Sequence, residues 1–91
     1  MAVVHLEIAG RVQGVGFRHF VRQHALRLGL SGWVRNLSSG NIECAVGGTP
    51  QGLEEFLTVV RAGPDGADVK QVITLTPPAS LELPTPFTIL K

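Results

Sequence analysis

Apolar residues follow a strand-like spacing in some parts of the chain and a helical spacing in others. The order of these segments along the chain limits the folds that it can adopt. Four stretches are predicted to be strands, and in the first and third of them apolar and polar residues alternate with a period of two, as in strands with one buried face. They are residues 4–8, 31–37, 42–46 and 69–75. Residues 17–28 and 53–60 instead place apolar side chains at the i, i+3, i+4 spacing of amphipathic helices.

The predicted order is therefore β-α-β-β-α-β, and Phe87 and Ile89, after Pro86, indicate a short last strand. This order is typical of the α+β class. It predicts a ferredoxin-like sandwich, in which an antiparallel sheet carries two helices on one face and the short C-terminal strand is added. The same architecture supports many unrelated activities, so function has to be argued from particular residues.

Residues at the ends of the predicted elements agree with this order. Gly29 can end the first helix in the left-handed conformation. Thr49 can cap the second helix, Pro50 suits its first position, and Gly63-Pro64 stops it. We expect Gly47-Gly48 to break the third strand.

Length and charge narrow the class of protein. A chain of 91 residues fits one domain, residues 1–91. The net charge of +1 gives no strong global field, so any recognition of anions must be local and we expect no nucleic-acid partner.

The single cysteine, Cys44, cannot form an internal disulfide. No basic segment followed by an apolar core suggests a signal peptide, and no run approaches the roughly 20 apolar residues of a membrane span. We expect a cytoplasmic protein.

The segment Gly10–Arg18, with sequence GRVQGVGFR, lies where the first strand ends and the first helix begins. Backbone N–H groups at a helix N-terminus lack internal partners and carry partial positive charge. Gly14 and Gly16 let the backbone curl so that successive N–H groups converge, which would form an oxyanion cradle. Arg18, on the first helical turn, can hold two phosphate or carboxylate oxygens at once. The alternative is that these glycines only make a tight turn and that Arg18 is solvated.

Known phosphate-binding patterns do not fit this segment. A P-loop needs Lys-Ser or Lys-Thr after its second glycine, and a dinucleotide-binding loop needs a third glycine where His19 stands. The cradle contains no Cys, Ser or Thr that could act as a nucleophile, which indicates direct attack by water. Asn36, at the end of the second strand, offers a hydrogen-bond donor and acceptor in one group and could orient that water. Alternatively, Asn36 only begins the turn that follows.

Two motifs resemble the signatures of the acylphosphatase family. The family patterns G-x-V-Q-G-V-x-F-R and G-W-V-x-N are complete here, as Gly10–Arg18 and Gly32–Asn36. The resemblance implies hydrolysis of the carboxyl–phosphate bond of acyl phosphates without metal or cofactor. In this reading Arg18 binds the phosphate, Asn36 positions the attacking water, and inorganic phosphate is both a product and a weak inhibitor. The backbone amides that would complete the cradle are those of Gln13, Gly14, Val15, Gly16 and Phe17.

Other titratable residues are expected to have structural roles. We expect His5 to be a solvated residue of its strand and His24 to lie on the inner or boundary face of its helix. Cys44 is expected to be a core residue. His19 follows Arg18 but points about 100° away from it on a helix. No His, Cys, Asp and Glu cluster has metal-ligand spacing. Family members often end in Arg-Tyr, whereas this chain ends in Leu90-Lys91, so any support from those residues is missing here.

The sequence is compatible with two other functions. The first is a module that binds phosphate or carboxylate groups without turnover, and Asn36 argues against it. The second is an RNA-binding domain of the same architecture, which would need exposed aromatic residues on the sheet. The strands offer only Trp33 and Phe87 for that purpose. For either enzyme or binding module, we expect a monomer.

Overall fold

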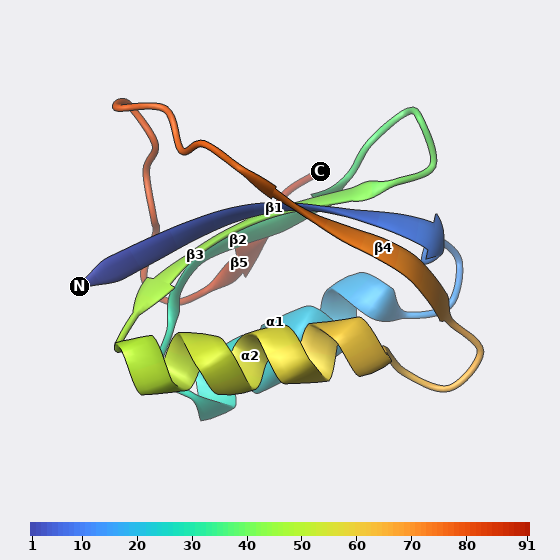
Figure 1. The fold of residues 1–91 in the computed structure, drawn as a ribbon, viewed down its shortest axis with the longest axis horizontal. Helices are drawn as coiled ribbons and strands as arrows, with labels where there is room; N and C mark the ends of the chain where they lie inside the picture. The colour runs from blue at the N-terminus through green and yellow to red at the C-terminus, as the bar shows by residue number, and fades with distance from the viewer.

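A computed structural model describes residues 1–91 and confirms the predicted order of elements. The elements are β1 (Ala2–Arg11), α1 (Phe17–Arg27), β2 (Ser31–Asn36), β3 (Ile42–Gly48), α2 (Pro50–Ala62), β4 (Asp68–Leu75) and β5 (Thr88–Ile89). Both helices pack on one face of the sheet, and the segment after β4 runs on the opposite side (Figure 1). Neither helix is long and apolar enough to cross a membrane.

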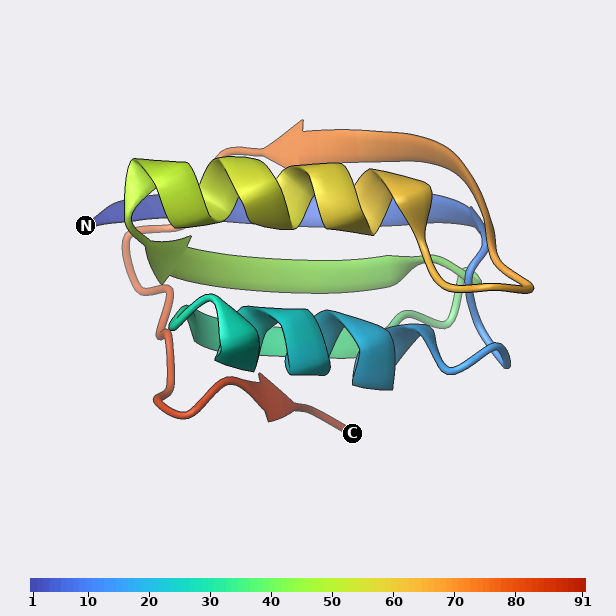
Figure 2. The same ribbon diagram turned by 90° about the horizontal axis from the view of Figure 1, so that it is seen from below.

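The strands form one sheet in the order β4-β1-β3-β2-β5. β1 pairs antiparallel with β3 and β4, and β2 pairs antiparallel with β3, which agrees with the antiparallel sheet that the sequence predicts. β5 differs, because it pairs parallel with β2. The chain leaves β4 at one edge of the sheet and crosses to the other edge before β5 begins (Figure 2). This long return lets β5 run in the same direction as β2, so the complete sheet is mixed.

The core lies between the helices and the sheet, where 15 buried apolar residues form one cluster. Val12 and Phe17 belong to this cluster and are almost completely buried. They stand at the two ends of the loop that joins β1 to α1. Because burial of a large apolar side chain contributes about 1.5–3 kcal/mol, these two residues fix both ends of that loop against the core.

The predicted helix ends are confirmed, but the predicted break at Gly47-Gly48 is wrong. Thr49 Oγ1 accepts a hydrogen bond of 3.0 Å from Gly52 N, and Gly29 has the expected positive φ of 69°. β3 continues through both glycines: Gly47 pairs with β1 and β2, and Gly48 pairs with β1. A Cβ atom on Gly48 would collide with the Leu30 side chain, so glycine leaves room for a neighbour at this last residue of β3.

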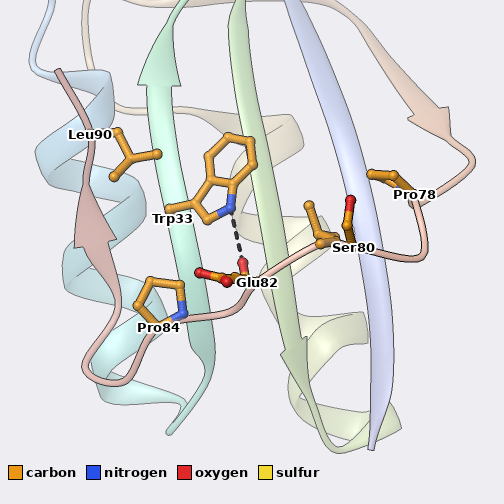
Figure 3. Close-up of a pocket in the computed structure, with 7 residues that line it drawn as sticks. Trp33, Pro78, Ser80, Glu82, Pro84 and Leu90 are labelled. Carbon is orange, nitrogen blue, oxygen red and sulfur yellow. Dashed lines mark hydrogen bonds between the residues drawn. The ribbon is translucent and has the colours of Figure 1, made fainter.

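The prediction that His5 is solvated is also wrong, whereas Cys44 is buried in the core as predicted. His5 is only 8% exposed, and its Nε2 lies 2.7 Å from Glu43 Oε2. Its ring packs edge-on against Trp33, with 6.1 Å between centroids. The indole Nε1 of Trp33 donates to Glu82 O at 3.1 Å, which ties the segment after β4 to this face of the sheet (Figure 3). The outer face is therefore partly covered, and polar residues on it need not be exposed.

Candidate active site

A cavity of about 190 Å³ lies where the β1–α1 loop meets the end of β2. The loop and the β2–β3 turn lie at the same end of the sheet (Figure 2). The residues that line the cavity are Val12, Gln13, Gly14, Gly16, Phe17, Arg18, His19 and Asn36. The structure therefore brings together the two segments that the sequence analysis singled out. Val15 is the exception among the predicted residues, because it packs against the core and does not line the cavity.

A larger hollow of about 410 Å³ lies beside Trp33, Glu82 and Leu90, on the face of the sheet opposite the helices (Figure 3). It is more open to solvent than the cavity at Arg18. No arginine or lysine lines it. We place the candidate site in the smaller cavity, because enclosure strengthens electrostatic interactions and the cationic and amide groups gather there.

The backbone of the loop has the conformation that an anion cradle requires. Gly14 and Gly16 have positive φ angles of 75° and 76°, which residues with a side chain rarely adopt. Gly16 is also the N-cap residue of α1 and offers no capping side chain, and the first helical turn has no acidic residue. None of the backbone N–H groups of residues 13–19 donates a hydrogen bond of ordinary geometry within the protein. These donors and the positive end of the helix dipole remain available to an anion.

Arg18 is half-buried on the first turn of α1 and forms no ion pair or side-chain hydrogen bond. Two other arginines are engaged: Arg27 pairs with Glu55 at 2.8 Å and Arg35 pairs with Glu43 at 2.6 Å. No Asp, Glu or Cys is among the cavity-lining residues. The guanidinium of Arg18 therefore keeps all its donors for a ligand with oxygen atoms.

Asn36 is the last residue of β2, and its exposed side chain makes no hydrogen bond. The turn that follows is closed by backbone groups, with Leu37 N donating to Asn41 O at 2.8 Å and Gly40 N to Leu37 O at 3.1 Å. The side chain of Asn36 thus takes no part in forming the turn. Both its donor and its acceptor are free at the cavity.

The structure adds a role for Gln13 that the sequence analysis missed. Its side-chain Nε2 donates to Leu37 O at 2.8 Å and to Asn41 O at 2.9 Å. The acceptors are backbone carbonyls 24 and 28 residues away along the chain. Every residue has a backbone carbonyl, so no sequence pattern singles out these two, and only the fold could identify them.

Apart from Arg18 and His19, no titratable side chain lines the cavity. Cys44 is fully buried, and burial raises the pKa of its thiol. Burial alone would raise the pKa of Glu43, but hydrogen bonds from His5 and Arg35 outweigh that effect and hold the pKa below its usual value. His19 lines the cavity and is exposed. No group of three or more His, Cys, Asp and Glu side chains is arranged to hold a metal ion.

Sequence and structure comparisons both match this chain to acylphosphatases. The family model described as acylphosphatase matches residues 4–89. An acylphosphatase of Acidiphilium cryptum is 47% identical over 73 residues, which cover 80% of each chain. The crystal structure of acylphosphatase from Bacillus subtilis superimposes with a TM-score of 0.84 and 31% identity over 100% of both chains. A structure of an acylphosphatase from Coxiella burnetii has a TM-score of 0.84 and 32% identity, covering 97% of this chain and 90% of that one.

Proposed function

This chain belongs to the acylphosphatase family, and we propose that it hydrolyses the carboxyl–phosphate bond in the cavity between the β1–α1 loop and the end of β2. Its activity is that of an acylphosphatase, and its substrates are small-molecule acyl phosphates. One observation carries the assignment of the site. The free guanidinium of Arg18, the unpaired N–H groups of the loop and the free amide of Asn36 all border one cavity.

In the proposed complex the phosphoryl group occupies the cradle. The backbone N–H groups of the cavity-lining residues Gln13, Gly14, Gly16 and Phe17 and the guanidinium of Arg18 donate to its non-bridging oxygens. Phosphoryl transfer proceeds through a loose transition state with charge spread over those oxygens. Donors fixed in advance in an enclosed site stabilise this charge, because they need no reorganisation as it develops.

We assign Asn36 to the water nucleophile. Its Oδ1 accepts a hydrogen bond from the water, and its Nδ2 donates to a phosphoryl oxygen, so the water oxygen faces the phosphorus atom. The new phosphorus–oxygen bond forms as the bond to the acyl oxygen breaks, and that electron pair leaves with the carboxylate. Of the two protons of the water, one stays on the oxygen that becomes a phosphate hydroxyl group, and the other passes to a phosphoryl oxygen or to solvent. The leaving carboxylate has an ordinary pKa near ~4, so it departs without a general acid.

We further propose that residues 1–91 work as one monomeric domain in the cytoplasm. All five strands belong to one sheet, and all buried apolar residues except Ala45 belong to one cluster, which supports a single domain. The free thiol of Cys44 is compatible with a reducing compartment.

The first prediction concerns metal ions. Hydrolysis of an aromatic acyl phosphate by the purified protein should persist in excess chelator, with kcat changed by less than about twofold, a difference below 0.5 kcal/mol in barrier. The reason is that Arg18 and the backbone N–H groups supply the positive charge that the phosphoryl group needs. A large loss of activity that added divalent ion restores would contradict this mechanism. Binding of acyl phosphate without turnover would instead favour the non-catalytic module.

The second prediction concerns the anion cradle. Inorganic phosphate should inhibit weakly and competitively, because as a product it occupies the same donors as the substrate. On titration with phosphate, the amide NMR signals of Gly14, Gly16 and Arg18 should shift, whereas signals of β4 should stay in place. Purely non-competitive inhibition, or shifts confined to other parts of the protein, would rule out the cradle.

A further inference from the structure

We infer that the side chain of Gln13 is a positioning residue, which holds the β2–β3 turn against the cradle and so aligns Asn36 with the bound phosphoryl group. The inference rests on the proposed function, because it concerns the water-orienting role of Asn36. The inference also goes beyond the proposed function, because the family signature assigned only the backbone amide of Gln13 to the site.

The two hydrogen bonds of Gln13 use all the donors of its amide. A primary amide has two N–H groups, and here one points to Leu37 O and the other to Asn41 O. Each of those carbonyls also accepts a backbone bond within the turn, from Gly40 N and Leu37 N respectively. A carbonyl oxygen has two lone pairs, so both acceptors are fully used. Gln13 therefore closes the turn from the outside and fixes its shape.

These are the only hydrogen bonds that join the loop to the hairpin. Arg18 makes none, the backbone N–H groups of residues 13–19 make none, and Asn36 makes none with its side chain. Asn36 directly precedes Leu37, one of the two residues that Gln13 holds. The distance between the cradle and the Asn36 amide thus depends on Gln13 more than on any other polar contact.

The turn is anchored to β1 on another side as well. Asn41 Nδ2 donates to Glu7 Oε2 at 2.6 Å, and Asn41 N donates to Ser39 Oγ at 3.3 Å. Glu7 therefore fixes the turn relative to the sheet, whereas Gln13 fixes it relative to the cradle. Only the second relation sets the geometry of the water against the phosphoryl group.

The same geometry argues against direct binding of phosphate by the Gln13 side chain. Both its donors are already engaged, and the remaining group, Oε1, is an acceptor that a phosphate oxygen would not approach. Loss of the side-chain amide should therefore spare phosphate affinity and lower the rate of the chemical step. A misplacement of about 1 Å can reduce a rate by about 10²-fold, so we expect kcat to fall between about tenfold and 10²-fold.

The test uses Gln13→Met, which keeps the length of the side chain and removes both donors. The matched control is Gln23→Met, because Gln23 is exposed on α1 and makes no side-chain hydrogen bond. For each protein kcat, the competitive inhibition constant of phosphate, and hydrogen exchange at the Leu37 and Gly40 amides are measured. We expect Gln13→Met to lose at least about tenfold in kcat, a barrier increase of at least 1.4 kcal/mol. Its phosphate inhibition constant should change by less than about threefold, and both turn amides should exchange faster.

Three results would each overturn the inference: a kcat within about twofold of wild type, a phosphate inhibition constant that rises in step with the loss of kcat, or unchanged exchange at the turn amides. If Gln13→Met does not fold, Gln13→Asn replaces it with the same expectations, because its amide is one methylene too short to reach both carbonyls. Asn36→Ala is measured in the same series. If Asn36→Ala keeps its kcat, the water-orienting role proposed for Asn36 fails. If Asn36→Ala is inactive and Gln13→Met is normal, only the role of Gln13 fails.

Discussion

Asn36→Ala should lower kcat by about 10³-fold or more, because it removes the only group assigned to orient the water. Asn36 acts chiefly in the transition state, so competitive inhibition by phosphate should remain close to that of wild type. Folding should be unaffected, since the exposed side chain makes no hydrogen bond in the protein. Turnover and phosphate inhibition are measured on one preparation, and circular dichroism confirms the fold.

Asn36→Asp provides a contrast to the alanine variant. It retains the shape and one acceptor of asparagine but places a negative charge beside the phosphoryl group. This variant should therefore lose phosphate affinity as well as turnover. If kcat of Asn36→Ala stays within about twofold of wild type, a change too small for loss of a catalytic group, Asn36 does not orient the water. It would then serve only as the residue before the turn.

Arg18→Lys should weaken substrate binding and reduce kcat by roughly 10²-fold or more, a scale like that of other lost electrostatic stabilisers. Lysine keeps the charge but cannot reproduce the planar fork that donates to two oxygens at once. Stability should hardly change, because Arg18 has no partner in the protein whose loss would matter. Kinetic constants and thermal unfolding of the purified variant check both expectations.

Arg22→Lys is the matched control for this substitution. Arg22 lies on the same helix, is exposed, forms no ion pair and does not line the cavity. It should have wild-type kinetics. A well-folded Arg18→Lys protein with kinetics as good as those of the control would remove Arg18 from the site.

The outer face of the sheet lacks the exposed aromatic rings that the alternative function, RNA binding, would need. Of the two aromatic residues that the sequence analysis considered, Phe87 is fully buried in the core. Trp33 packs against His5 and lies 5.5 Å from the guanidinium of Arg35, and its N–H group is bonded to Glu82. A base-stacking surface needs several exposed rings. A titration with single-stranded RNA at low salt distinguishes this alternative from the acylphosphatase.

The sequence by itself determined the features that depend on neighbouring residues. Alternation and helical spacing indicated the elements, because each depends on which side chains share a face. The curled loop was also predictable, since Gly14 and Gly16 allow positive φ angles that other residues resist. The helix N-terminus placed Arg18 beside those amides.

Tertiary structure decided whatever depends on residues far apart in the chain. The approach of Asn36 to the loop follows from the pairing of β1 with β3 and of β3 with β2. The partners of Gln13 are backbone carbonyls, which every residue possesses, so no sequence pattern could single them out. The burial of His5 and the parallel pairing of β5 depend on the path of the segment after β4 across the sheet. Local preferences select the conformation of each element, but strand register and packing decide which of their polar groups meet.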